Sequence, residues 1–298
     1  MNKKPDSLRM ATKTGRIIRF TGKTGLVEDK ESLVVCQMRR QKTIPVCGDL
    51  VDWTPVDAQG VITNVHERRN AFARADRHGR KRWVAANLDG ICVVLAPHPE
   101  PTRDLLNRYL VACENLSIEP IVVCNKMDLA LDMAYWTELR ERYQSLGYAV
   151  AFTTATGGDA NQFAGELTDG VHILVGQSGV GKTALLNQLI PDLDLQTGRV
   201  SEATGKGTHT TTATTLYKRP DGGALIDSPG VWEFGIWKMS PEEIAHGFRE
   251  FRQFQGLCRF HNCQHLHEPD CAVAEAADTG RIAMDRLASY RRIVGALE

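Results

Sequence analysis

The stretch Gly176-Gln-Ser-Gly-Val-Gly-Lys-Thr183 decides the fold of this 298-residue chain. It follows the apolar run 171–175 and opens the helical pattern 182–190, the context that a phosphate-binding G-x-x-x-x-G-K-[ST] loop requires. Glycines let backbone N–H groups turn towards phosphate oxygens at the positive end of a helix. The residues expected to bind nucleotide are Gly176, Gln177, Ser178, Gly179, Val180, Gly181, Lys182, Thr183 and Ala184. Lys182 and Thr183 are also catalytic candidates, because Lys182 would reach the β- and γ-phosphates and the Thr183 hydroxyl would bind Mg²⁺.

Apolar runs alternate with helical patterns on both sides of this loop. Buried strands are predicted at residues 88–96, 120–124, 148–152, 171–175 and 224–227, and helices at 102–113, 134–146 and 182–190. This alternation is typical of a mostly parallel sheet with helices on both faces. The sequence therefore predicts a P-loop domain of the α/β class.

A second motif, Asn125-Lys-Met-Asp128, ends the predicted strand 120–124, at the sheet edge where open α/β sheets bind ligands. The Asp128 carboxylate can accept hydrogen bonds from the ring N–H and the exocyclic amine of guanine, whereas adenine would leave it unpaired. We expect Asn125 to connect this base loop to the phosphate loop, and the Lys126 stem to lie over the purine ring. The predicted guanine-binding residues are Asn125, Lys126, Met127 and Asp128, and an ATPase is disfavoured.

Asp227-Ser-Pro-Gly230 fits a third GTPase element, in which Asp227 holds Mg²⁺ through water and the Gly230 N–H senses the γ-phosphate. The threonine-rich stretch 204–215 between the P-loop and this element cannot pack a core. It is either a plain surface loop or a switch that closes on Mg²⁺ through one of Thr210, Thr211 and Thr212. The base loop precedes the phosphate loop, which reverses the usual order. The GTPase domain is therefore predicted to be circularly permuted.

Residues 12–65 read as short strands separated by turn residues, which predicts a small antiparallel β-barrel. Between Arg68 and Arg82, seven of fifteen residues are Arg or Lys. This run is either a solvated linker or a contact for the phosphate backbone of a nucleic acid. The candidate RNA-binding residues in it are Arg74, Arg77, Arg80, Lys81 and Arg82.

Three cysteines and several histidines gather near the C-terminus, in the pattern Cys258-x₄-Cys263-x-His265-x₅-Cys271. Three thiolates and one imidazole fill the four tetrahedral positions of a structural zinc ion. Free cysteines beside surface histidines are the alternative, and His261 and His267 are competing ligands. Further possible phosphate contacts are Arg259, Arg281, Arg286, Arg291 and Arg292.

Composition narrows the class of protein. The 36 Lys and Arg residues balance 36 Asp and Glu residues, which excludes a uniformly basic nucleic-acid coat protein. The apolar runs are too short to span a bilayer, and no apolar region follows residues 1–10, so we expect no signal peptide. Cysteine usage does not suggest a secreted disulfide framework. We therefore expect a cytoplasmic monomer without membrane contact.

The permuted order, the preceding barrel and the Cys/His pattern together resemble the RsgA (YjeQ/YloQ) family of ribosome small-subunit-dependent GTPases over nearly the whole chain. The stretches that carry the resemblance are 125–128, 176–183, 207–212, 227–231 and 258–271. The resemblance implies an OB-fold RNA-binding domain at 1–68, a permuted GTPase domain at 69–237 and a helical zinc-binding domain at 238–298. It also implies one structural Zn²⁺, Mg²⁺ with GTP, contact with rRNA, and a late-maturation role on the small ribosomal subunit, which stimulates hydrolysis.

Val231 stands where many GTPases carry a water-orienting Gln, so we expect slow intrinsic hydrolysis. His209 is the catalytic candidate to position water in its place, as the resemblance also suggests, although a loop histidine is often only solvated. Thr154 and Ala155 loosely match the usual backbone contact to the base. A rival interpretation is a zinc-containing RNA-binding protein that senses GTP without significant turnover.

Overall fold

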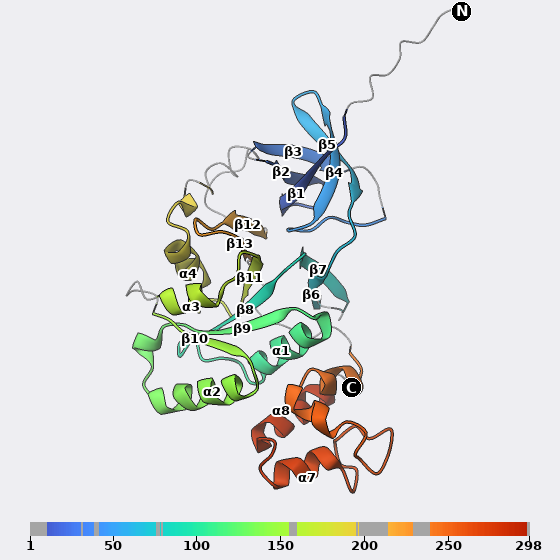
Figure 1. The fold of residues 1–298 in the computed structure, drawn as a ribbon, viewed down its shortest axis with the longest axis vertical. Helices are drawn as coiled ribbons and strands as arrows, with labels where there is room; N and C mark the ends of the chain where they lie inside the picture. Colours follow the sequence, from blue (N-terminus) through green and yellow to red (C-terminus); the bar gives the residue numbers. More distant parts are fainter. Residues whose placement is uncertain are drawn as a thin grey trace, which may run out of the picture.

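The computed structural model describes residues 11–30, 32–38, 42–75, 78, 80–154, 160–194, 196, 214–228 and 239–296. The strands are β1 (Lys13–Phe20), β2 (Thr24–Asp29), β3 (Ser32–Met38), β4 (Leu50–Val56), β5 (Gln59–Val65), β6 (Ala71–Ala75), β7 (Lys81–Ala86), β8 (Gly90–Leu95), β9 (Glu119–Cys124), β10 (Ala149–Phe152), β11 (Val171–Val175), β12 (Thr215–Lys218) and β13 (Ala224–Asp227). The helices are α1 (Leu105–Leu116), α2 (Met133–Ser145), α3 (Asn161–Glu166), α4 (Lys182–Leu189), α6 (Pro241–His246), α7 (Ala272–Asp278) and α8 (Met284–Gly295), with 3₁₀ turns at Met127–Leu129 and Arg249–Phe254. A barrel, a sheet flanked by helices and a helical C-terminal part follow one another down the molecule (Figure 1).

The first five strands close into a barrel, in the order β1-β2-β3-β5-β4 and back to β1. Its interior is filled by apolar side chains from these strands: Ile17, Val27, Cys36, Val51, Trp53 and Ile62. The predicted OB-like barrel is confirmed, but two details differ from the expectation. The strand β2 is additional, and β3 and β5 pair in parallel because β5 returns along the edge of β3 after its hairpin with β4.

The central sheet has the order β10-β9-β8-β11-β13-β12, and its first five strands are parallel. Apolar side chains of α1 and α2 pack on one face, and those of α3 and α4 pack on the other face. Strands buried on both faces explain the continuous apolar runs, and β8 is buried along its whole length. The predicted mostly parallel α/β sheet is confirmed, and the carboxyl ends of β9, β11 and β13 lie at one edge.

The barrel and the central sheet are joined through β12. This strand pairs antiparallel with β13, and Thr215 also pairs with Arg19 of β1. The Lys218 ammonium lies 2.9 Å from the Glu28 carboxylate of β2, which adds an ion pair to the same junction. The strands of the two parts therefore form one continuous sheet.

The C-terminal part packs on α1 and α2 and shares their apolar core. Arg286 of α8 is 2% exposed; its Nε donates to Glu250 Oε1 at 2.6 Å, and its Nη1 donates to Asn107 Oδ1 of α1. Arg292 donates two hydrogen bonds to Asp104, of 2.6 and 2.8 Å. The prediction that Arg286 contacts phosphate is therefore wrong, because this guanidinium is buried between two parts of the protein.

No helix among the described residues is both long enough and apolar enough to cross a membrane.

Candidate nucleotide pocket and Cys/His cluster

The phosphate loop connects β11 to α4, and its glycines have backbone geometry that other residues rarely adopt. Gly176 and Gly181 have φ values of 136° and 97°. A Cβ on Gly176 would lie 2.2 Å from the carbonyl oxygen of Val94, and a Cβ on Gly181 would lie 2.3 Å from Asn125 Nδ2. Both glycines are therefore required for the loop to pass so close to its neighbours.

The base loop contacts this phosphate loop directly. Asn125 is fully buried, and its Nδ2 donates to the carbonyl of Val180 at 2.9 Å. Lys126 Nζ donates to the carbonyls of Gly179 at 2.5 Å and of His98 at 3.1 Å. Asp128 follows in the 3₁₀ turn and is exposed. The structure thus brings two loops that are about 50 residues apart in the chain into one pocket.

Thr153 is part of this arrangement, although the sequence motif 153–156 indicated a base contact only for its neighbours Thr154 and Ala155. It is 1% exposed, its hydroxyl donates to Asn125 Oδ1 at 2.8 Å, and its carbonyl accepts from the backbone N–H of Met127. The hydroxyl fixes the amide of Asn125 with Nδ2 towards the phosphate loop. Strand register was the signal that could have found it, since Phe152 pairs with Cys124 in adjacent parallel strands.

Two opposite charges lie at the phosphate side of the pocket, Lys182 partly buried and Asp227 buried. Lys182 Nζ donates to the carbonyls of Gly176 and Gln177 at 2.8 and 2.7 Å. Burial lowers the pKa of Lys182, and burial raises the pKa of Asp227, which ends β13 and is 9% exposed. The charge of each group partly opposes the other's shift in pKa. A polyphosphate with a divalent cation offers the complementary charges, so both groups fit such a ligand.

Thr183, at the start of α4, is exposed. Its hydroxyl and the Asp227 carboxylate are oxygen donors of the kind that Mg²⁺ prefers. Of the remaining predicted residues, Thr154 accepts a hydrogen bond at its carbonyl from Gln188 Nε2 at 3.3 Å. The predictions for Ala155, His209, Thr210, Thr211, Thr212, Gly230 and Val231 lie outside the described residues.

Helix α1 and the loop before it support the phosphate loop from the side. Tyr109 is fully buried in α1, and its hydroxyl lies close to the backbone of Gly176, which acts to lower the pKa of this hydroxyl against the larger effect of burial, which raises it. The backbone N–H of Thr102 donates to Gln177 Oε1 at 3.3 Å. Neither contact was indicated by the sequence, because both join segments far apart in the chain. Since Asp104 and Asn107 contact α8, the same segment touches the phosphate loop and the C-terminal part.

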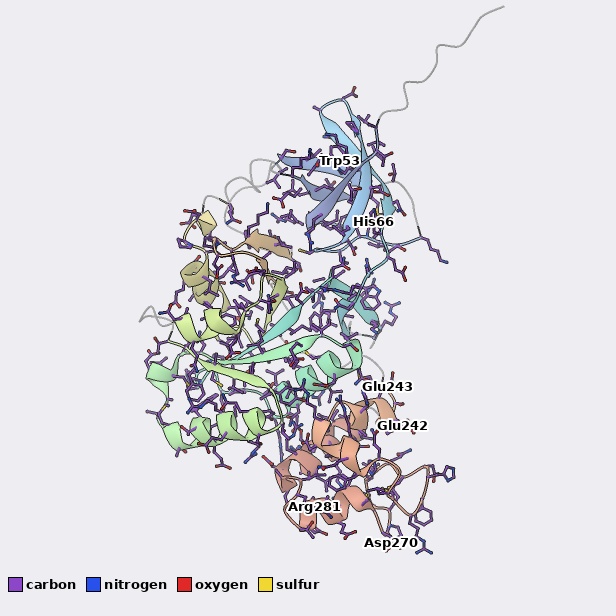
Figure 2. All side chains as sticks on the ribbon, in the orientation of Figure 1. Trp53, His66, Glu242, Glu243, Asp270 and Arg281 are labelled. Carbon is purple, nitrogen blue, oxygen red and sulfur yellow. The ribbon has the colours of Figure 1, made fainter. Side chains whose placement is uncertain are left out.

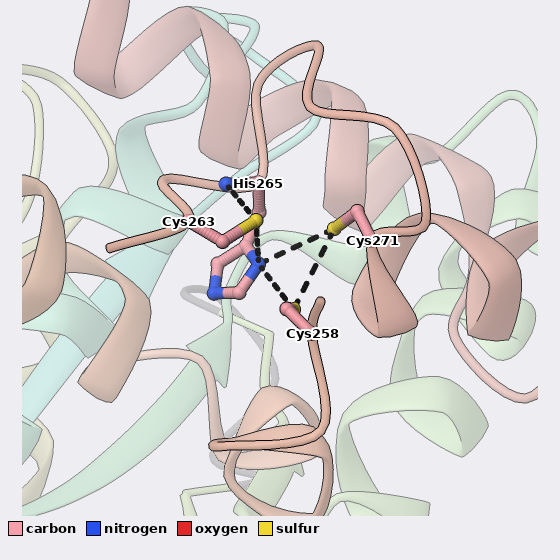
Figure 3. A group of neighbouring side chains, drawn as sticks. All are labelled: Cys258, Cys263, His265 and Cys271. Atoms are coloured by element: carbon pink, nitrogen blue, oxygen red, sulfur yellow. Dashed lines mark hydrogen bonds between the residues drawn. The ribbon is translucent and has the colours of Figure 1, made fainter. Parts of the chain in front are cut away.

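The Cys/His cluster lies in the loops before α7, with its four side chains converging (Figure 3). The ligand atoms of Cys258, Cys263, His265 and Cys271 all lie within 4.8 Å of one another. His265 Nδ1 is 3.6, 3.5 and 3.4 Å from the three sulfur atoms in that order, and the sulfurs of Cys258 and Cys271 are 4.0 Å apart. Zn–S bonds of about 2.3 Å and a Zn–N bond of about 2.0 Å put tetrahedral ligand atoms roughly 3.5–3.8 Å apart. The cluster therefore fits a zinc site.

Two further hydrogen bonds orient the cluster. The backbone N–H of Ala274 donates to Cys271 Sγ at 3.5 Å, and the N–H of His265 donates to Cys263 Sγ at 3.4 Å. Such N–H···S contacts stabilise thiolates around a metal. His261 and His267 are exposed and do not belong to the cluster, so the geometry selects His265 among the competing histidines.

The basic run forms the antiparallel hairpin β6–β7 and the residues beside it. Its interpretation as a linker is wrong, because Phe72 and Ala85 anchor the hairpin in the main core. Of the candidate RNA-binding residues, Arg74, Lys81 and Arg82 lie on these two strands, Arg80 lies just before β7, and Arg77 is outside the described residues. Among the other arginines, Arg259 pairs with Asp270, and Arg291 donates to the carbonyl of His265.

The phosphate loop follows the base loop in the chain, yet both lie at one edge of the same parallel sheet, so the fold and the loops define a circularly permuted P-loop GTPase. A family model described as RsgA GTPase matches residues 65–237. The chain belongs to the RsgA GTPase family.

Curated relatives and solved structures extend the similarity over most of the chain. The Small ribosomal subunit biogenesis GTPase RsgA of Marinobacter nauticus is 45% identical over 265 residues, which cover 87% of this chain and 76% of that protein. RsgA 1 of Vibrio vulnificus is 39% identical over 293 residues, 95% of this chain and 83% of that protein. The crystal structure of YjeQ from Thermotoga maritima matches with a TM-score of 0.78 and 32% identity, covering 96% of this chain and 99% of the other. That of YloQ, described as a circularly permuted GTPase, gives 0.73 and 25%, covering 99% and 98%.

Proposed function

We propose that this protein is a GTPase of small ribosomal subunit biogenesis, which hydrolyses GTP to GDP and phosphate with stimulation by the subunit. The names of its relatives support the process. The observation that carries the chemistry is the hydrogen bond from Asn125 to the carbonyl of Val180, because it joins a guanine-type base loop to a phosphate loop in one pocket.

The mechanism follows from groups that the pocket brings together. Asp128 pairs with the guanine edge, and Asn125, Lys126 and Met127 hold the base loop against the phosphate loop. Lys182 exchanges its carbonyl partners for oxygens of the β- and γ-phosphates, which stabilises charge as water attacks in line. Thr183 and Asp227 would hold Mg²⁺, which neutralises the phosphate oxygens when bound. Thr210 or Thr211 and Gly230 complete the γ-phosphate side, and His209 positions the attacking water.

We also propose that Cys258, Cys263, His265 and Cys271 hold one structural zinc ion. All four tetrahedral positions would be taken by protein, so this metal would stabilise the fold and take no part in hydrolysis.

The proposed partners are the small ribosomal subunit and its rRNA, bound by a cytoplasmic monomer. We place an OB-like RNA-binding domain at 1–68, the GTPase domain at 69–237 and the zinc-binding domain at 238–298. The hairpin residues Arg74, Arg80, Lys81 and Arg82, with Arg77, are proposed phosphate contacts, because a cluster of cations close together in the chain favours binding to the RNA backbone.

Release of phosphate over many turnovers tests this function, measured with GTP alone and with purified small subunits added. A severalfold or greater increase with subunits is expected. Hydrolysis that stays negligible in their presence would instead favour a protein that senses GTP without turnover. Co-sedimentation with subunits under GDP and under a non-hydrolysable GTP analogue then shows which nucleotide state binds.

A further inference from the structure

Trp83 lies on the outer half of the hairpin β6–β7, and its side chain is in contact with solvent. It is 44% exposed, whereas Trp53 and Trp136 are 3% and 4% exposed. The inner half of the hairpin is buried through Phe72 and Ala85, so the outer half is held firmly in place. Burying a large indole is normally favourable, and an exposed tryptophan on an anchored hairpin is thus a candidate contact for a partner.

Two cations lie close to this indole. Lys81 Nζ is 4.8 Å from the centroid of the Trp83 ring, and Arg68 Cζ is 6.0 Å from it. Arg68 is fixed by two hydrogen bonds of 2.8 Å to the buried carboxylate of Asp49, so its charge is already compensated. Lys81 is exposed and lies on β7 beside the ring, where an ammonium group suits an incoming anion.

The surroundings of Trp83 combine apolar and basic character. Arg68 Nη2 also donates to the carbonyl of Ile44 in the barrel, and the Ile44 side chain is 61% exposed. Arg82 precedes Trp83 on β7 and pairs with Arg74 of β6 in the strand register. The carboxylate of Glu243 in α6, which Figure 2 labels, is an acidic group near enough to act on the charge of Lys81. The basic residues thus lie on the hairpin itself, next to the exposed ring.

We propose that Trp83 is a stacking platform for one unpaired RNA base, with Lys81 and Arg82 contacting the adjacent phosphates. This inference rests on the proposed rRNA partner and specifies which form of RNA the hairpin takes. Every base has a π-face that can stack on indole, whereas bases inside a duplex already stack on one another and are not accessible. The site therefore selects single-stranded nucleotides without a strong preference for sequence.

Binding of the full-length protein to RNA tests this proposal. The probes are a fluorescein-labelled 12-nucleotide oligouridine and a labelled 12-base-pair RNA duplex, titrated by fluorescence anisotropy at 50–200 mM KCl. Trp83→Ala is expected to weaken oligouridine binding about 10-fold, and Trp83→Phe is expected to weaken it less, because phenylalanine keeps an aromatic face. Duplex binding is expected to change less than about twofold in either variant. Tyr135→Ala, which removes another exposed aromatic ring, is the matched control and should bind both probes like the unaltered protein.

The salt dependence of RNA binding distinguishes stacking on Trp83 from contacts between cations and phosphates. Trp83→Ala should leave the slope of log K against log[KCl] unchanged, whereas Lys81→Gln should reduce its magnitude by about 0.7. The proposal is overturned if the unaltered protein does not bind oligouridine, if Trp83→Ala binds it normally, or if this variant loses single strands and duplexes equally. Subunit-stimulated phosphate release is measured in the same preparations. If the subunits do not stimulate release, the proposed function is contradicted. If they do stimulate release but Trp83→Ala binds RNA normally, only the stacking platform is contradicted.

Discussion

The Cys/His cluster draws its four ligand atoms from the 14-residue stretch 258–271, whereas the nucleotide pocket joins loops that begin at residues 125, 176 and 227. The cluster lies among short helices in a small C-terminal part, whose apolar side chains belong to the core shared with α1 and α2. The pocket instead lies at the edge of a parallel sheet whose strands β8 and β11 are buried along their whole length. The comparison indicates that the Cys/His cluster stabilises the C-terminal part, whereas the parallel sheet stabilises the nucleotide pocket.

The largest effect is expected from Cys271→Ser, because it removes one zinc ligand and Cys271 also begins α7. Structural zinc contributes about 10 kcal/mol or more to small metal-dependent domains. The variant should lose its bound zinc and unfold at a much lower temperature. Elemental analysis and thermal unfolding measure both effects, and His261→Ala should keep one zinc ion per chain. Full zinc content in Cys271→Ser would mean that the cluster is wrongly assigned.

Arg286→Met tests how the C-terminal part is held on the rest of the protein. It leaves the Glu250 carboxylate buried without its cation, which should lower the free energy of unfolding by about 3 kcal/mol. Urea denaturation measures this change. Arg259→Met breaks the exposed pair with Asp270 and should cost less than about 1 kcal/mol. Equal losses in the two variants would show that burial of the Arg286–Glu250 pair does not matter.

Thr153→Val tests whether the pocket depends on long-range support. Valine leaves Asn125 Oδ1 buried without its donor, so the amide can no longer be held towards Val180, and GTP should bind about 10-fold more weakly. Thr153→Ser keeps the hydroxyl and should bind GTP almost normally. Isothermal titration with GDP and a GTP analogue gives both affinities. Unaltered affinity in Thr153→Val would remove Thr153 from the pocket.

The smallest effect concerns His172 of β11, which is 2% exposed. Burial and the charge of Arg219 lower its pKa below the ordinary 6.5, while Asp89 opposes this shift. As the pH falls below that value, the unfolded chain binds a proton before the folded protein does, so stability decreases. His172→Gln should lose less stability than the unaltered protein between pH 7.5 and 5.5 in urea denaturation. Parallel losses in both proteins would exclude this role.

Local sequence patterns were sufficient to predict the barrel, the central parallel strands and the presence of the Cys/His cluster, because each depends on residues close together in the chain. Continuous apolar runs identified β8, β9 and β11, and cysteine spacing identified the cluster, whereas the choice of His265 over His261 and His267 required the geometry. The contacts from Thr153 and Tyr109 to the pocket depend on strand register and helix placement, which no local pattern contains.

The same limit explains the two wrong interpretations. The basic run was compatible with a linker, because nothing local indicates that Phe72 and Ala85 anchor it in a distant core. Arg286 was compatible with an exposed phosphate contact, because its partners Glu250 and Asn107 lie 36 and 179 residues away in the chain. Residues whose partners are distant in sequence are thus the ones that sequence patterns cannot place.

Nucleotide selectivity of Asp128→Asn tests the central claim most directly. An asparagine amide cannot accept from both the ring N–H and the exocyclic amine of guanine, but it can donate to the second carbonyl of xanthine. The variant should bind GTP about 100-fold more weakly than the unaltered protein does, and it should bind xanthosine triphosphate more tightly. The affinity for ATP, measured for both proteins, is the reference. If Asp128→Asn prefers GTP over ATP as strongly as the unaltered protein does, the pocket does not recognise guanine through this residue, and the account of the site is wrong.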